Sequence, residues 1–308
     1  MSTIKNSNSA SLGKILGDIG REAMIQNTVS RDYLEITEKK APEIFRVFAF
    51  GDIIGDPGRK ALFTLLPKYK SKYNPDMIVL NGENSAHGFG INPAVAKIIF
   101  DGGVDVITTG NHVWQKKEVF DILDKIPPLL RPLNYPPKTP GHGSYIFEKN
   151  GVKAAVINII GRIFMDPVDC PFQAVDKEIE RLHDDGVKII LIDFHAEATS
   201  EKQVFGWFFD GRISGIWGTH THVQTADERI LPKKTAYISD IGMCGSTESV
   251  IGMKTVESYR KVIQHLPVRF SPEEGGPYEV NGIIIDILKE TGEAIAIQRL
   301  KEPVSVLM

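Results

Sequence analysis

Short apolar runs alternate with amphipathic stretches through most of this chain, and this alternation constrains the fold more than any other feature. Strand-like runs, rich in β-branched and aromatic residues, occupy residues 45–50, 77–80, 104–108, 153–160 and 188–192. Helical spacing of apolar residues appears between them, over residues 56–69, 93–100, 116–125 and 173–183. We therefore expect an α/β fold built from βαβ units, with a mainly parallel sheet covered by helices on both faces.

The two ends of the chain depart from this alternation. Near the carboxyl terminus, residues 282–287 and 294–297 flank a Glu-Thr-Gly turn, which predicts a β-hairpin. At the other end, residues 1–44 form an amino-terminal extension that carries apolar residues at helical spacing: Leu12, Ile15, Leu16, Ile19 and Ala23. Three glycines interrupt this pattern, so a short amphipathic helix and a disordered segment are both open.

Polar side chains of the types that bind metals stand where five of the apolar runs end. In chain order they are Asp52, Glu83 with Asn84, Asn111 with His112, His195, and His220 with His222. Open α/β sheets build their sites at the carboxyl ends of strands. The steps from Asp52 to Glu83 and from Glu83 to Asn111 are 31 and 28 residues, about one βαβ unit each. Consecutive parallel strands would therefore set these groups side by side.

Each of these residues also has a purely structural explanation. Asp52 could cap a helix, Glu83 could be solvated, and Asn111 could close a turn beside a glycine. His220 and His222 share one face of an extended segment, where hydrogen-bonded histidines are common. It is less economical to explain all five strand ends by such separate structural roles than by one shared site. Together they offer a mixed nitrogen and oxygen ligand set for divalent cations, and the lack of a thiolate argues against a structural zinc site.

Taken in order, these motifs resemble those of the calcineurin-type metallophosphoesterases. The matching segments are Gly51-Asp52, Gly82-Glu83-Asn84, Gly110-Asn111-His112, His195 and Gly218-Thr219-His220-Thr221-His222. The resemblance runs from about Phe45 to the carboxyl terminus and is nearer to one subgroup, the YmdB-type phosphodiesterases. It implies a layered sandwich in which helices flank central β-sheets, formed by a metallophosphoesterase domain over residues 45–308. Residues 247–278 could supply a small cap over the site.

The resemblance also implies a metal centre with assigned ligands. Two divalent ions, iron or manganese with zinc as an option, would be held at the strand ends. One ion would have Asp52, Glu83, Asn84 and His222 as ligands, and the other Glu83, Asn111, His195 and His220, so that Glu83 bridges. The wider family has a histidine where this chain has Ile54, and Asn84 would replace that imidazole.

The implied activity is hydrolysis of a phosphodiester by a hydroxide that bridges the two metals. Cyclic nucleotides, including 2′,3′-cyclic ones, are the implied substrate class. His112 is expected to be catalytic, donating a proton to the leaving oxygen or stabilising the transition state. Two other functions stay open: a phosphomonoesterase on the same scaffold, and a metal-binding regulatory module that acts through protein partners.

Composition narrows the setting in which such a protein would work. The net charge of -3 gives no basic stripe for a nucleic-acid backbone, so a polymeric nucleic acid is unsupported as a partner and a small substrate is expected. Two cysteines are too few for a disulfide framework, and no apolar run is long enough to span a membrane. We expect a cytoplasmic protein without a membrane partner, and homo-oligomerisation is left open.

Overall fold

Strand β1 (Ile44–Phe50) shows how this chain builds its layers. In the computed structural model, which describes residues 43–305, Phe45, Val47 and Ala49 pack into one apolar core while Phe48 and Phe50 pack into another. Side chains alternate between the two faces of a strand, so a strand buried on both faces reads as a continuous apolar run. β1 therefore lies inside a sheet that is covered on both sides.

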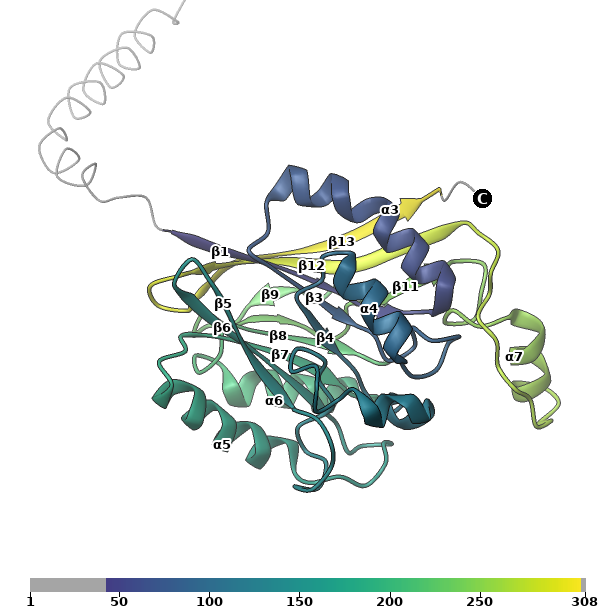
Figure 1. Cartoon of the computed structure of the whole chain (residues 1–308), viewed down its shortest axis with the longest axis horizontal. Coiled ribbons are helices and arrows are strands. Elements are labelled where there is room, and N and C mark those ends of the chain that lie inside the picture. Colours follow the sequence, from purple (N-terminus) through teal and green to yellow (C-terminus); the bar gives the residue numbers. More distant parts are fainter. Residues whose placement is uncertain (1–42, 306–308) are drawn as a thin grey trace, which may run out of the picture. The chain divides into compact units, whose positions relative to one another are not determined.

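Two mixed β-sheets make up the centre of the fold (Figure 1). The first has the order β2 (Asp52–Ile53), β11 (Met243–Ser246), β12 (Tyr278–Leu288), β1, β3 (Met77–Asn81) and β4 (Val106–Thr108), with β13 (Ala294–Val304) paired to β12. The second has the order β5 (Ser144–Lys149), β6 (Val152–Ile160), β7 (Ile189–His195), β8 (Gly215–Thr219), β10 (Ala236–Ile238) and β9 (Arg229–Ile230).

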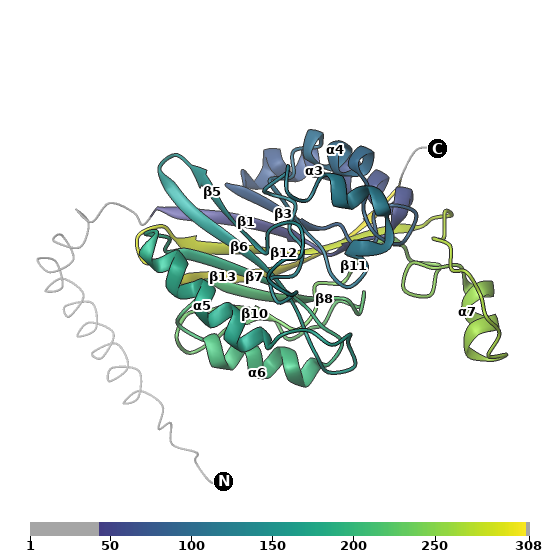
Figure 2. The ribbon, with the colours of Figure 1, turned by 60° about the horizontal axis from the view of Figure 1, so that its bottom comes forward.

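Three apolar cores separate four layers. The central core joins the facing sheets, with Val79 of β3 and Leu191 of β7 among its members. Helices α3 (Gly55–Tyr73) and α4 (Pro93–Asp101) cover the outer face of the first sheet, while α5 (Pro171–Asp184) and α6 (Thr199–Phe209) cover that of the second (Figure 2). The α/β class and the predicted sandwich with helices outside central sheets are confirmed.

Two expectations about the elements are wrong. The chain forms two mixed sheets and not one mainly parallel sheet. The predicted carboxyl-terminal hairpin is confirmed as β12 and β13, and β12 pairs antiparallel with β1, while β5 pairs antiparallel with β6 in the second sheet. The helix expected over residues 116–125 is replaced by the 3₁₀ turns η1 (Val113–Gln115) and η2 (Lys117–Asp121). The chain must return at once to β4, where Leu130 N donates to Ile107 O at 2.8 Å, and this leaves little room for a full helix.

One helix stands apart from these layers. Helix α7 (Thr255–Val262) projects from the body next to the first sheet in both views (Figures 1 and 2). Among the described residues, no helix is long and apolar enough to cross a membrane. The amphipathic helix considered for the amino-terminal extension falls on residues outside the described part and stays a prediction.

Candidate metal centre

The structure brings the eight predicted site residues together at one end of the two sheets. His195, the last residue of β7, lies at the middle of this group. Its Nε2 atom is 3.0 Å from Glu83 Oε1, 3.1 Å from Asn111 Oδ1 and 3.0 Å from His220 Nδ1. Ligand atoms of Glu83, His195 and His220 all lie within 4.8 Å of one another. The first sheet supplies the carboxylate and amide, and the second supplies the imidazoles.

A second part of the group surrounds Asp52. Its Oδ1 atom is 3.9 Å from His222 Nε2 and 3.9 Å from His195 Nδ1, and its Oδ2 atom accepts from His220 N at 3.2 Å. Asn84 donates from Nδ2 to Gly88 O at 2.9 Å. Asp52 Oδ1 and Asn84 Oδ1 are both buried, and neither has a hydrogen-bond partner among the described residues. Buried oxygens without donors are costly, and a bound cation would satisfy both.

Glycines permit the close approach of these side chains. A β-carbon at Gly110 would lie 2.3 Å from Glu83 Oε2 and 2.3 Å from the His195 ring. A β-carbon at Gly218 would lie 1.8 Å from Ser239 O. Both distances are far below van der Waals contact, so the glycine in each motif is required by space.

A hydrogen bond at Nδ1, the ring nitrogen that does not face the ligands, orients the His195 side chain. His195 Nδ1 is 2.9 Å from the Thr219 hydroxyl, which itself donates to Asp193 Oδ1 at 2.7 Å. Because the hydroxyl hydrogen is used on Asp193, Thr219 accepts from His195, and Nδ1 carries the proton. This hydrogen-bond pattern assigns the Nδ1 proton and directs Nε2 at the group of ligands, where Nε2 would bind a cation once it has given up its own proton.

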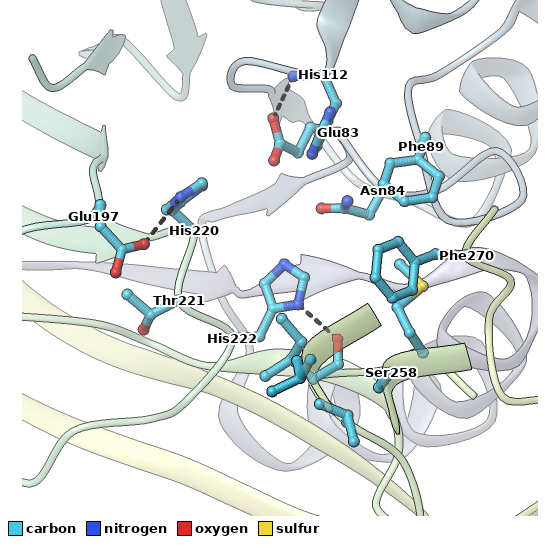
Figure 3. Close-up of a pocket in the computed structure, with 14 residues that line it drawn as sticks. Glu83, Asn84, Phe89, His112, Glu197, His220, Thr221, His222, Ser258 and Phe270 are labelled. Carbon is cyan, nitrogen blue, oxygen red and sulfur yellow. Dashed lines mark hydrogen bonds and ion pairs between the residues drawn. The ribbon is translucent and has the colours of Figure 1, made fainter. Parts of the chain in front are cut away.

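The other two histidines follow the same arrangement. His220 Nε2 is 3.2 Å from the Glu197 carboxylate, and His222 Nδ1 donates to Ile251 O at 2.8 Å (Figure 3). His220 Nδ1 and His222 Nε2 are thereby left as acceptors. Metal-ligating histidines almost always donate their second ring nitrogen to a carboxylate, carbonyl or water. Three imidazoles oriented in this way fit a divalent cation better than a hydrogen-bonded core.

The buried carboxylates give the centre a negative potential. Burial raises the pKa of Asp52 to about 7, although His222 and His195 partly oppose this. Burial also acts on Glu83, but the interactions with His195 and His112 outweigh it and lower the pKa of Glu83 to about 2. Within the described part of the chain, the ion-pair partners of both carboxylates are histidines and not lysine or arginine. A divalent cation would neutralise both carboxylates.

The histidines respond to the same surroundings. Burial opposes protonation of His195, yet the carboxylates of Glu83 and Asp52 raise its pKa to about 9. Burial lowers the pKa of His220 to about 3, with repulsion from His195 adding to the effect. Burial likewise lowers the pKa of His112, whose backbone N donates to Glu83 Oε2 at 3.1 Å. His220 is thus a neutral imidazole, the form that binds metals.

A cavity of about 440 Å³ opens over this group (Figure 3). Its lining residues are Glu83, Asn84, Phe89, His112, Glu197, His220, Thr221, His222, Val250, Ile251, Met253, Ser258, Val262 and Phe270. The volume lies within the range of small-molecule sites, roughly 300–1,000 Å³. A small substrate can therefore reach Glu83, His112 and both histidines of the pair.

Backbone strain accumulates around the same cavity. His220, His222 and Ile251 have φ angles of +97°, +65° and +49°. Such conformations cost about 1–3 kcal/mol each in residues other than glycine and persist where the surrounding structure enforces them. Ile251, a β-branched residue, adopts this conformation while its carbonyl accepts the hydrogen bond from His222.

Four residues that act on the site were not predicted from the sequence: Asp193, Glu197, Thr219 and the Ile251 carbonyl. Glu197 follows His195 by two residues and was the one that spacing could have indicated. Thr219 contacts His195 only through the parallel register of β7 and β8, in which these two residues are paired. That register is not visible in the sequence.

The layered fold, with this centre at the strand ends, is that of the metallophosphoesterase class. A crystal structure of a novel phosphatase from Mycoplasma pneumoniae has a TM-score of 0.80 and 33% identity, covering 85% of this chain and 94% of that one. A crystal structure of a hypothetical protein from Thermus thermophilus has a TM-score of 0.79 and 37% identity, covering 84% of this chain and 99% of that one.

Sequence comparison assigns the chain within this class. A model of the YmdB-like protein family matches residues 48–300. A 2′,3′-cyclic-nucleotide 2′-phosphodiesterase of Bacillus subtilis (strain 168) is 46% identical over 255 residues, which is 83% of this chain and 96% of that protein. The chain belongs to the YmdB-like family, and the resemblance drawn from the motifs is confirmed.

We predict that Thr219→Val weakens metal binding about 10–100-fold, because His195 loses the partner that orients its ring. Asp193 and His195 would also lose a buried partner, so the free energy of unfolding of metal-free protein should fall by about 1–3 kcal/mol. Competition with a chelator and urea unfolding measure these two effects. Thr64→Val, on the exposed side of α3, is the matched control. Unchanged metal affinity in Thr219→Val would contradict the assigned orientation.

Proposed function

We propose that this chain is a dinuclear metal-dependent phosphodiesterase that hydrolyses 2′,3′-cyclic nucleotides. The observation that carries the proposal is the convergence of three pre-oriented imidazole nitrogens with two buried, unpartnered oxygens beneath a cavity of about 440 Å³. The similarity to the Bacillus subtilis phosphodiesterase supports this substrate class. The free cysteines Cys170 and Cys244 agree with a cytoplasmic location, which is part of the proposal.

The contacts support two groups of metal ligands. Glu83, Asn111, His195 and His220 would hold one ion, as the short distances around His195 Nε2 suggest. Asp52, Asn84 and His222 would hold the other together with Glu83, and the unpartnered oxygens of Asp52 and Asn84 belong to this group. Glu83 would bridge. The mixed nitrogen and oxygen set suits manganese, iron or zinc, and we favour iron or manganese.

When bound, paired divalent cations supply an activated water and neutralise charge on the phosphoryl oxygens. The chain's own residues then orient the substrate. For a 2′,3′-cyclic phosphate, the water oxygen forms the new bond to phosphorus, the bond from phosphorus to O2′ breaks, and O2′ takes up a proton. The product is a 3′-nucleotide.

Three contacts support a role for His112 at the leaving oxygen. Its backbone is held by Glu83 through the 3.1 Å hydrogen bond, and its ring packs edge to face on Phe89 with 5.1 Å between centroids. His112 lines the cavity and is not one of the proposed metal ligands. We assign His112 to hydrogen bonding or proton donation at the oxygen that departs.

Hydrolysis of 2′,3′-cyclic AMP tests the proposed function directly. Purified protein should open the cyclic diester to 3′-AMP, lose activity after chelation, and regain it with manganese or iron(II). Activity that survives complete metal removal would contradict the proposal. Release of inorganic phosphate from 3′-AMP, with no opening of the cyclic diester, would indicate the phosphomonoesterase instead.

For His112→Ala, we expect the metal content to stay at the wild-type level while kcat falls about 10²–10⁴-fold, the usual contribution of general acid catalysis. Elemental analysis and steady-state kinetics on the same preparation give both quantities. His183→Ala, at an exposed position of α5, should leave both unchanged. Turnover of His112→Ala within about threefold of wild type would refute the role, because general acid catalysis contributes far more than that.

A further inference from the structure

The cavity over the metal centre has two chemically different walls. The site residues described above form one wall, and the other is apolar, made of Phe89, Val250, Ile251, Met253, Val262 and Phe270. Figure 3 shows Phe89 and Phe270 on the same side of the cavity, across from Glu197 and Thr221. A phosphate does not interact favourably with an apolar wall, so this wall faces another part of the substrate.

Most of the apolar wall comes from residues 247–278, which we call the α7 segment. Ser258 and Val262 lie four residues apart on one face of α7, and both line the cavity. The two arms of the segment join below the helix, where Lys254 N donates to Ser271 O at 3.0 Å. Phe270 precedes this junction directly, so the paired arms restrain its backbone.

The α7 segment is packed against the site and tied to it. A β-carbon at Gly88 would lie 3.0 Å from Pro272 Cγ and 3.2 Å from Met253 Cε, so the loop that carries Phe89 contacts the junction of the arms. The hydrogen bond from His222 to Ile251 O links the segment to the centre. These contacts hold the segments that carry Phe89 and Phe270, both half-buried, next to the centre.

We propose that Phe270, together with Phe89, forms the stacking site for the nucleobase of the substrate; this rests on the proposed function. No lysine or arginine lines the cavity among the described residues, whereas a second phosphate or a polynucleotide backbone would call for them. A nucleobase is neutral and presents flat faces, which stack well on aromatic rings. The α7 segment thereby acts as the substrate-binding cap considered from the sequence.

Two substrates that differ only in the base test this site. They are 2′,3′-cyclic AMP and the 2′,3′-cyclic phosphate of methyl riboside, which has the same diester and sugar without a base. Stacking of one base is worth roughly tenfold or more in binding. Phe270→Ala should lower kcat/KM for 2′,3′-cyclic AMP by about tenfold. For the cyclic phosphate of methyl riboside, the same substitution should change kcat/KM less than about twofold. Phe270→Trp, which keeps an aromatic ring, should still favour the substrate with the base over the one without it.

Tyr259→Ala is the matched control, because Tyr259 is an exposed aromatic residue of α7 that does not line the cavity. It should leave both substrates unaffected. An equal loss on both substrates in Phe270→Ala, or a wild type that does not favour the base, would overturn the stacking site.

The proposed function and the stacking site can fail separately. If neither cyclic substrate is opened while bis(p-nitrophenyl) phosphate is hydrolysed, the proposed substrate class is wrong. In that case, inhibition by adenosine in the same assay tests the stacking site alone. Inhibition that Phe270→Ala weakens about tenfold supports the site, and no inhibition of the wild type overturns it.

Discussion

The buried carboxylate of Asp193 joins the two sheets directly beneath the metal centre. It accepts from Asn81 Nδ2 at 3.1 Å and from the Thr108 hydroxyl, both in the first sheet, and from the Thr219 hydroxyl at 2.7 Å in the second. Burial raises the pKa of Asp193, while these donors oppose the shift. A buried polar network is favourable only when its members are satisfied, so it fixes one relative placement of the sheets.

That placement decides whether the centre can form. Glu83 and Asn111 follow strands of the first sheet, whereas His195 and His220 lie at the ends of strands of the second. A sliding of one sheet over the other by a single residue would separate them by about 3 Å. His220 and His222, which follow β8 directly, have positive φ angles, a conformation that persists only where the surrounding structure enforces it.

The sequence predicts the parts of this site that depend on local pattern and spacing. Runs ending in Asp52, Glu83 and Asn111 at intervals of one βαβ unit were enough to place these groups together. Long-range pairing could not be predicted: Phe50 of β1 pairs with Gly282 of β12, far along the chain, and this antiparallel pairing makes the first sheet mixed. Thr219 reaches His195 through the register of two strands, and the Ile251 carbonyl reaches His222 from a strained loop. Neither contact leaves a signal in the sequence.

We propose that two cations would share Glu83 at the junction of the sheets. Anomalous diffraction at the manganese edge, from crystals grown with manganese, measures this most directly. The contacts described here predict two peaks about 3.5–4 Å apart, one next to His195 Nε2 and His220 Nδ1 and the other next to Asp52 Oδ1 and His222 Nε2. A single peak, or none beside Glu83, would contradict the claim.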